Sequence, residues 1–408
     1  MFNIIKWVQT LPNWVLIGFV IFIIMFNISI SSIISNYILK YYRVTKSKEK
    51  AMYRVRILSQ YFQGFITVVS ILCMELFLVP LLKQIFESTG ISIYVTILTP
   101  FPVLVVLAIL NQLILYKTIK EIRETTDSRK EQLGSLLRVL AFAFIPMIIY
   151  FSIMFFLPRI FPKNTNFYNI LIIVIPILLV FLINIIMPFF YKNMLRANEL
   201  TSGELSSELN MFLAKNGFNN IAIYEYPTKK SKVANALVSG FISKKIFLSD
   251  YLIENASSEE IKAIIAHEMG HMKKKHLWLR LLSILTFMIT VMGLGYGMEW
   301  IEMHFKIKIP EIPGIVFFAM IVILYFGFIY LYFTRIQERQ ADEYVLEVGI
   351  DPSVFISSLM RLARLNHTVM RFKKLDEKFQ THPSYTKRIL WIERKAGIQY
   401  NILDFKPN

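Results

Sequence analysis

The sequence predicts a mostly α-helical polytopic membrane protein with about seven transmembrane helices and a small cytoplasmic α+β domain. Apolar residues make up 55% of the 408 positions, and the mean hydropathy is +0.51, so the chain is more apolar than an average soluble domain. Seven apolar runs of roughly 18–24 residues are each long enough to cross a hydrocarbon core of about 30 Å. The charged and mixed stretches between and after them predict the soluble part.

The spans divide the chain into four parts. Residues 1–190 contain five spans, and residues 281–334 contain two more. Residues 191–280 and 335–408 are the soluble parts. Only Lys6 precedes the first span, so we expect a retained helix rather than a cleavable signal peptide. The expected spans are at about 14–34, 62–82, 93–115, 139–157, 167–190, 281–298 and 316–333.

Basic residues concentrate in the loops after the first and third spans, at about 35–61 and 116–138. The positive-inside rule therefore places the N-terminus outside, and the C-terminus and residues 191–280 in the cytoplasm. We interpret the net charge of +17 as charge that flanks spans and meets anionic lipid headgroups, so we predict no nucleic-acid partner. The single cysteine, Cys73, excludes an intramolecular disulfide.

The soluble parts combine helical and strand patterns. Residues 205–216 fit a helix, and residues 221–226 alternate like a strand that ends at Pro227. Two more short strands are expected on either side of Gly240. After the last span, Gly349 stops one helix and Pro352 opens another. The remaining expected elements are strands at 232–238 and 245–248, a helix at 335–348 and a basic helix through Arg394.

The motif that carries chemistry is His267-Glu268-x-x-His271, within a helical pattern that begins with a capping box at Ser257 and Glu260. Positions four apart lie on one helix face, so both histidines can bind one Zn²⁺. Glu268 is placed to take a proton from a water that the zinc activates. The alternative is a chance match in a lysine-rich helix. The pattern therefore predicts one zinc ion per chain.

A catalytic zinc needs a third protein ligand. Glu338 and Asp342 lie four residues apart, just after the last apolar run. Glu338 can bind the zinc, and Asp342 can accept the free ring N–H of a ligand histidine. Without the H-E-x-x-H motif, Glu338 and Asp342 would be interpreted as part of a solvated, charged helix face.

This combination resembles the integral-membrane zinc metalloproteases of the CAAX prenyl protease type 1 family, of which the HtpX-like proteases are shorter relatives. Seven spans, two of them between the helices that share the zinc, match the CAAX type. The matching segments are Asn235-Ala236, residues 266–271 with His276 beyond, Glu338 to Asp342, and His382-Pro383 with Arg388.

The resemblance implies a wet intramembrane chamber with the zinc near its cytoplasmic roof. It also implies that Asn235-Ala236 and His382 hold the scissile peptide, which agrees with edge-strand pairing and oxyanion stabilisation. Arg388 is expected to pair with a carboxylate such as Asp342. Without the family, His382 fits a turn or cap residue and Arg388 a surface residue. The other histidines are interpreted as structural or solvated: His276, His304 and His367.

The sequence thus predicts a membrane-embedded zinc endopeptidase that cuts short, extended or membrane-associated peptides, its partners being such substrates and the bilayer. Whether the substrate is a prenylated CAAX-type peptide stays open, as does the oligomeric state. One alternative is an HtpX-like quality-control protease, and another is a non-catalytic, zinc-containing peptide sensor or scaffold. A transporter has little support, because Glu75 is the one clear acid at the centre of a span.

Overall fold

The computed structural model describes residues 7–8, 10–86, 98–162, 165–309 and 311–400. It divides into two compact units. Within the described residues, seven helices are long and apolar enough to cross a membrane, which confirms the predicted multi-pass helical fold. Unit 1 comprises Met1–Ile183, Asn193–Leu195 and Lys230–Lys232, and unit 2 comprises Asn184–Lys192, Arg196–Lys229 and Val233–Asn408.

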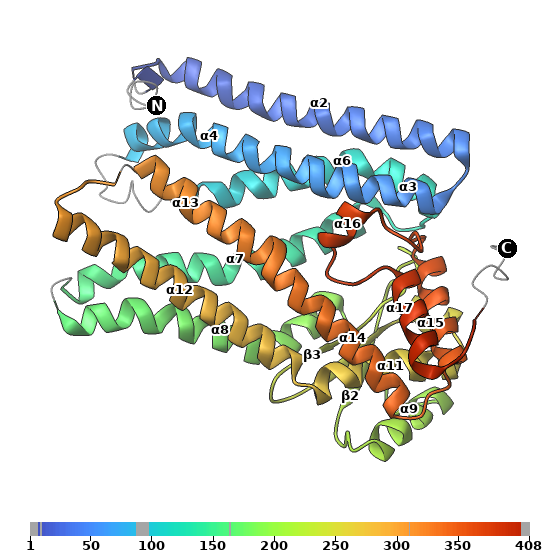
Figure 1. The fold of residues 1–408 in the computed structure, drawn as a ribbon. Helices are drawn as coiled ribbons and strands as arrows, with labels where there is room; N and C mark the ends of the chain where they lie inside the picture. The colour runs from blue at the N-terminus through green and yellow to red at the C-terminus, as the bar shows by residue number, and fades with distance from the viewer. Residues whose placement is uncertain (1–6, 9, 87–97, 163–164, 310, 401–408) are drawn as a thin grey trace. The chain divides into compact units, whose positions relative to one another are not determined.

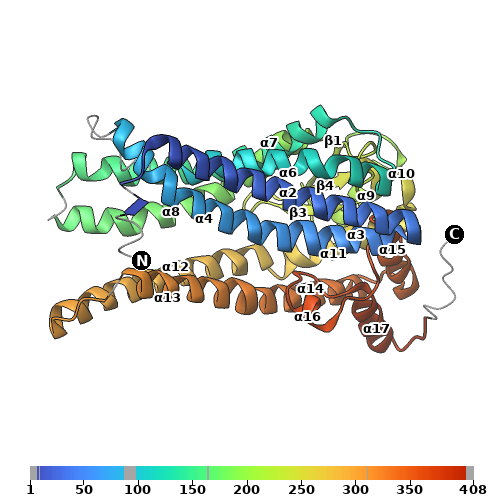
Figure 2. The same ribbon diagram turned by 90° about the horizontal axis from the view of Figure 1, so that it is seen from above.

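Unit 1 is built from long helices, of which α2, α4 and α6 pack side by side (Figures 1 and 2). Polar side chains join these helices: the Asn27 amide donates to Thr67 Oγ1 at 3.3 Å and to Ser70 Oγ at 3.2 Å. Such hydrogen bonds link helices in lipid, where apolar burial does not. The elements are α2 (Asn13–Thr45), α3 (Lys48–Arg54), a π-helical segment (Val55–Phe62), α4 (Gln63–Phe86), α6 (Pro100–Arg123), α7 (Arg129–Ile160) and α8 (Asn166–Leu195), the last shared with unit 2.

The helices extend beyond the predicted spans because a helical pattern need not end where the hydrocarbon ends. The first expected span, at 14–34, lies in a helix that continues to Thr45. The third was expected to begin at residue 93, but 93–97 lie outside the described residues and α6 begins at Pro100. The sixth span, expected from residue 281, lies in α12 (His276–Phe305), which therefore includes part of the basic stretch before it.

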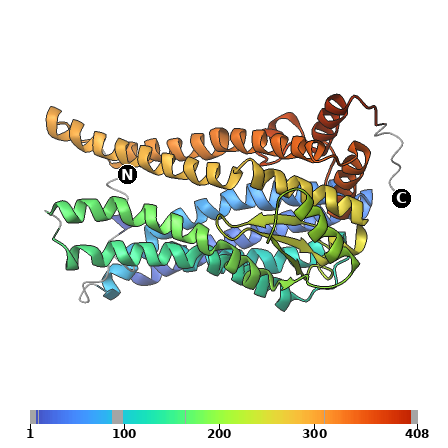
Figure 3. The same ribbon diagram turned by 90° about the horizontal axis from the view of Figure 1, so that it is seen from below.

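Unit 2 contains a four-stranded sheet in the order β1-β2-β4-β3 (Figure 3). The β2–β4 pair is parallel, and β3 pairs antiparallel with β4, so that β3 is an edge strand. Ile246 and Leu248 of β4 are fully buried in a cluster with Ile261 and Ile265 of α11. This apolar packing fixes the H-E-x-x-H helix against the sheet. The strands are β1 (Asn198–Glu199), β2 (Ala222–Tyr226), β3 (Ala236–Ser239) and β4 (Lys245–Ser249).

One predicted strand is shorter than expected. The pattern at 232–238 predicted a strand over its full length, but β3 begins at Ala236. Lys232 has a φ of 52°, in the left-handed region, which extended strands do not use. Ala234 hydrogen-bonds to a side chain instead of a neighbouring strand. The pattern of β-prone residues therefore overestimated the strand at its start.

The helices of unit 2 carry the remaining motifs. The predicted capping box of α11 is present, with Ser257 and Glu260 exchanging hydrogen bonds. The predicted helix at 335–348 lies in α14, which continues a helical run from α13 through a π-helical segment. The helices are α9 (Glu204–Lys215), α10 (Asp250–Asn255), α11 (Ser258–Lys273), α12, α13 (Glu311–Leu324), the π-helical Tyr325–Tyr330, α14 (Leu331–Glu347), α15 (Pro352–Leu365), α16 (Lys374–Lys378) and α17 (Tyr385–Ala396).

Candidate metal centre

Helices α11 and α14 approach each other closely at Gly270. A Cβ atom on this glycine would lie 2.8 Å from Ala341 Cα and 3.0 Å from Tyr344 Cβ. Real Cβ contacts are not this short, so only glycine permits the approach. The residue between the two motif histidines thus brings the helix that carries Glu338 against the helix that carries His267 and His271.

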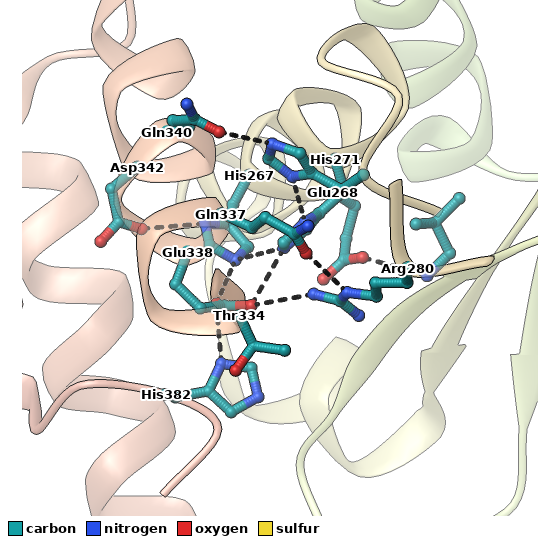
Figure 4. A network of polar contacts seen from close by, with 12 residues as sticks. His267, Glu268, His271, Arg280, Thr334, Gln337, Glu338, Gln340, Asp342 and His382 are labelled. Atoms are coloured by element: carbon teal, nitrogen blue, oxygen red, sulfur yellow. Dashed lines mark hydrogen bonds and ion pairs between the residues drawn. The ribbon is translucent and has the colours of Figure 1, made fainter. Parts of the chain in front are cut away.

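His267, His271 and Glu338 present three potential ligand atoms to one point (Figure 4). The two Nε2 atoms lie 3.3 Å apart. Glu338 Oε2 is 3.3 Å from His267 Nε2, and Glu338 Oε1 is 3.4 Å from His271 Nε2. Tetrahedral zinc with bonds of about 2.0–2.1 Å places neighbouring ligand atoms about 3.3–3.4 Å apart. The three spacings therefore fit one face of a zinc tetrahedron.

The Glu338 carboxylate also has unused acceptor capacity. Its residue is 1% exposed, and within the described part of the chain Oε2 has no hydrogen bond of acceptable geometry, although His382 Nδ1 lies 2.7 Å away. A buried acceptor that is left unsatisfied costs free energy. A cation bound between Glu338 and the two histidines would remove this cost, so the donor set fits zinc.

His267 is oriented from behind by Asp342 and Arg388. Asp342 Oδ1 accepts from His267 Nδ1 at 2.9 Å, which leaves Nε2 directed at the candidate metal position. Arg388 donates two hydrogen bonds to the same carboxylate, from Nε to Oδ2 at 2.8 Å and from an NH₂ group to Oδ1 at 2.5 Å. A carboxylate that fixes a ligand histidine, and is itself held by arginine, is the usual support of a zinc site.

His271 is oriented by a second histidine, His276. The Nδ1 atoms of the two rings are 2.8 Å apart, and His276 Nε2 is 3.0 Å from Gln340 Oε1. Because the glutamine oxygen only accepts, His276 carries its proton on Nε2 and accepts at Nδ1. His271 then donates from Nδ1 and keeps a free lone pair on Nε2. This chain of hydrogen bonds selects the tautomer that can bind a metal.

The position of His276 follows from the turn between α11 and α12. Lys275 has a φ of 57°, a left-handed conformation that turns the chain directly before His276. The His276 ring is 0% exposed, so of the two interpretations that the sequence left open, structural or solvated, it is structural. Its contact with His271 could have been found from the sequence only through the trailing histidine of the resembled family.

Glu268 lies beside the candidate ligand histidines and faces β3. Its Oε2 accepts the Val238 N–H at 3.0 Å. Burial raises the pKa of Glu268 to about 7, although the charge of His267 opposes the rise. A carboxylate with a pKa near neutrality can both take and return a proton, as general acid–base catalysis requires.

His267 and His271, the two candidate ligand histidines, differ in protonation when no metal is bound. Burial lowers the pKa of His267, but the neighbouring Asp342 and Glu338 carboxylates outweigh burial and raise the pKa to about 9. Burial and the neighbouring charge of His267 lower the pKa of His271 well below its ordinary value. At neutral pH the metal-free pair therefore carries one proton more than its neutral form, and this extra proton is on His267.

His382 lies at the open side of the cluster, with 60% of its side chain exposed. Two contacts hold the segment that carries it. Arg335, one turn before Glu338 on α14, donates to the Lys378 carbonyl at 2.9 Å. Glu377 accepts the Ser384 N–H at 3.1 Å. Contacts on both sides of His382 in the chain thus hold it close to Glu338, as Figure 4 shows for the two side chains.

Arg280, which the sequence reasoning did not single out, lies near the other carboxylate oxygen of Glu338. Its Nε donates to Gln337 Oε1 at 2.7 Å, and one of its NH₂ groups is 3.6 Å from Glu338 Oε1 (Figure 4). Its position at the start of an apolar helix made it look like a topology charge. The contact brings a permanent cation to the edge of the site.

Asn235 and Ala236 lie where β3 begins, on the edge strand that faces Glu268. Asn235 is exposed, and its carbonyl accepts the Ser249 N–H at 2.9 Å. Ala236 opens β3 and pairs in register with Leu248. The structure therefore places the Asn-Ala pair two residues from the strand position that contacts Glu268.

Comparison with known families identifies the same segments. A model described as "Peptidase family M48" matches residues 199–396, which include all nine residues of the predicted site. Over these residues the chain is similar to peptidase family M48. A second model, "BlaR1 peptidase M56", matches residues 101–291 and ends before Glu338. The M48 match is the one that contains both halves of the metal cluster.

Curated relatives include CAAX prenyl proteases and HtpX proteases. CAAX prenyl protease 1 of Saccharomyces cerevisiae is 26% identical over 230 residues, covering 50% of this chain and 50% of that protein. The homologue from Oryza sativa is 29% identical over 175 residues, covering 40% and 41%. Protease HtpX homolog of Helicobacter acinonychis is 24% identical over 179 residues, covering 40% and 58%. The chain thus spans about half the length of the curated relatives it matches.

The fold has a solved counterpart over almost the whole chain. The crystal structure of S. mikatae Ste24p superposes with a TM-score of 0.57 at 20% identity, covering 94% of this chain and 99% of that chain. This likeness confirms the multi-pass helical fold with its small sheet.

Proposed function

We propose that this protein is a membrane-embedded zinc endopeptidase that hydrolyses peptide bonds of extended or membrane-associated substrates. The observation that carries the proposal is the triangle of ligand atoms on His267, His271 and Glu338, with the Glu268 carboxylate beside it. Similarity to peptidase family M48 over residues 199–396 supports the same activity. The bound zinc would supply a Lewis acid, which lowers the pKa of a water and polarises a carbonyl.

The chain's own residues supply the proton transfers. Glu268 takes a proton from the attacking water on a carboxylate oxygen while the hydroxide oxygen bonds to the peptide carbonyl carbon. When the C–N bond breaks, Glu268 returns this proton to the leaving amine. Its pKa of about 7 suits both steps. The products are a new carboxyl end and a new amino end.

The neighbouring residues bind and orient. His382, exposed at the open side of the cluster, donates from its ring to the oxygen that becomes negative in the tetrahedral intermediate. Asn235 and Ala236 hold the substrate backbone along the edge of β3. Asp342, itself held by Arg388, keeps His267 in the tautomer that binds the metal.

We place the site on the cytoplasmic side of the membrane, with the N-terminus outside. The basic loops after α2 and α6 support this orientation through the positive-inside rule. Curated relatives are named as CAAX prenyl proteases and as HtpX proteases. The proposed substrates are therefore peptides that reach a membrane-surface site, and prenylation is a variable to be tested.

The competing hypothesis is a non-catalytic zinc-containing sensor. Within the described residues, the one cluster of potential metal ligands has three members, His267, His271 and Glu338. A structural zinc site is closed by four protein ligands, whereas a catalytic site keeps a position open. The three-ligand cluster therefore favours the enzyme.

The test uses detergent-purified protein and fluorogenic extended peptides, each made with and without a farnesylated cysteine. We expect cleavage that a zinc chelator abolishes and added zinc restores. Glu268→Gln should lose cleavage. Glu259→Gln is its matched control on the same helix, because Glu259 is 61% exposed and pairs only with Lys262 in the described residues. Equal rates for both peptide sets would assign the protein a broad substrate range, and no cleavage of either would support the sensor.

A further inference from the structure

The outer edge of β3 is defined by the way β3 pairs with β4. Ser249 donates its N–H to the Asn235 carbonyl, so the backbone groups of Asn235 face β4. Backbone groups alternate between the two edges of an antiparallel strand. Those of Ala234, Ala236 and Val238 therefore face outward, towards the space where an added strand would pair.

Asn366 occupies the outward position at Ala234. The Ala234 N–H donates to Asn366 Oδ1 at 3.1 Å, and Asn366 Nδ2 donates to the Ala234 carbonyl at 2.6 Å. The side-chain amide thus makes the same pair of hydrogen bonds that a residue of a neighbouring strand would make. Ala234 is 3% exposed, so its edge is closed.

The end of α15 holds Asn366 in this place. Asn366 is the residue that follows the last turn of α15, and its own N–H bonds back to the helix. Leu362 and Leu365 of α15 pack against the cluster that contains Ala234. The amide is therefore presented to the strand by a packed helix end.

The outward position at Val238 is used by the proposed general base. The Val238 N–H donates to Glu268. Between the two occupied positions, the outward N–H and C=O of Ala236 have no hydrogen-bond partner among the described residues. A single backbone pairing position is thus open, two residues from Glu268 and two residues from Asn366.

We propose that Asn366 ends the substrate-pairing edge of β3 and so limits how many residues follow the scissile bond. This inference rests on the proposed function. An extended substrate pairs antiparallel with β3 at Ala236, and its carboxyl side runs towards Ala234. A strand advances about 3.3 Å per residue, so Val238 and Ala234 are roughly 13 Å apart. About three residues after the scissile bond fit before the substrate meets Asn366.

A purely structural role for Asn366 predicts something different. If the amide only ties α15 to the sheet, its loss weakens the fold and slows cleavage of all substrates alike. If it ends the pairing edge, its loss opens two further backbone hydrogen bonds, at Ala234, to long substrates alone. Two such bonds change relative affinity by about tenfold.

The experiment compares peptides that share one scissile bond and carry one to eight residues after it. Asn366→Ala opens the edge, and Asn366→Asp keeps the acceptor for the Ala234 N–H but loses the donor. Asn216→Ala is the matched control, because Asn216 ends α9 with nearly the same backbone angles and its amide donates to the Phe212 carbonyl. A second series, extended on the amino side, tests the direction of pairing.

For wild type and Asn216→Ala, we expect kcat/KM to be about tenfold lower for peptides with more than three residues after the scissile bond than for shorter peptides. Asn366→Ala should remove most of that loss, with Asn366→Asp in between. The proposal is overturned if Asn366→Ala lowers kcat/KM equally for peptides of all lengths. It is also overturned if Asn366→Ala raises kcat/KM only for peptides extended on the amino side.

Binding of the same peptides to Glu268→Gln, followed by fluorescence anisotropy, separates this proposal from the proposed function. If no peptide is cut but Asn366→Ala in that background still restores binding of long peptides, the peptidase assignment fails and the pairing edge stands. If peptides are cut and neither measurement depends on Asn366, the peptidase stands and the pairing edge fails.

Discussion

Gly270 of α11 and Ala341 of α14 lie so close that a methyl group on Gly270 would be 2.8 Å from Ala341 Cα. Gly270 is adjacent to His271 and three residues after His267, and Ala341 is three residues after Glu338. The metal cluster is therefore set by the distance between two helix backbones, and not only by the ligand side chains.

Gly270→Ala should separate the two helices. Overpacking a tight contact costs about 1–3 kcal/mol, and we expect a lower Tm together with weaker zinc binding. Gly293→Ala in α12 is the control, because a Cβ there meets nothing within 4 Å. A Gly270→Ala protein with wild-type zinc affinity would show that the close approach does not set the site.

Replacement of Arg388 tests the support of Asp342. Arg388→Ala leaves the Asp342 carboxylate, 1% exposed, without its bidentate partner. Breaking such a buried pair costs about 3–5 kcal/mol, so thermal unfolding should show a large loss of stability. Arg388→Lys keeps the charge and should lose less. Arg394→Ala, at an exposed position of the same helix, should behave as wild type.

His276→Phe tests the chain of hydrogen bonds behind His271. The variant leaves His271 Nδ1 without its acceptor, and loss of such a partner weakens metal affinity by about 10–100-fold. Competition with a fluorescent zinc chelator measures this effect. His276→Asn offers an acceptor again and should recover part of the affinity. His304→Phe, at an exposed position, is the control, and an equal loss there would contradict the assignment.

Zinc binding should release close to one proton at pH 8. His267 has a pKa of about 9 without metal, whereas zinc binds the neutral ring, so the proton must leave. His271 is already neutral because its pKa is lowered. Because binding releases a proton, the apparent zinc affinity rises with pH up to about 9 and falls roughly tenfold for each pH unit below that value.

Calorimetry in two buffers of different ionisation enthalpy counts these protons. Asp342→Asn removes the carboxylate that holds the His267 proton, so the variant should release fewer protons at the same pH. Equal proton release by wild type and Asp342→Asn would contradict the assigned role of this pair.

The helical fold could be predicted because apolar length and loop charge are properties of single segments. The clustering of His267, His271 and Glu338 could be predicted because the two histidines share one helix turn and Glu338 lies in a compact motif after an apolar run. The strand order could not be predicted, since strands of two to five residues carry no signal of which neighbour they join. The parallel pairing of β2 with β4 is set by the tertiary packing against α11.

Other contacts depend on turns that the sequence pattern does not reveal. The left-handed turn at Lys275 brings His276 onto His271, although a continuous helix would have carried it away. Asn366 reaches Ala234 from 132 residues away along the chain. Arg280 looked like a topology charge and lies instead beside Glu338. Each of these residues has its role through a partner that is distant in sequence or reached by a bend.

The central claim is that His267, His271 and Glu338 hold a zinc ion on which Glu268 performs proton transfer. The most direct measurement is zinc content, by mass spectrometry, beside peptide turnover for wild type, Glu268→Gln and Glu338→Gln. We expect about one zinc per chain in wild type and in Glu268→Gln, with turnover in Glu268→Gln reduced on the order of 10²–10⁴-fold, and loss of both zinc and turnover in Glu338→Gln. Comparable turnover by Glu268→Gln, or full zinc content in Glu338→Gln, would contradict this account.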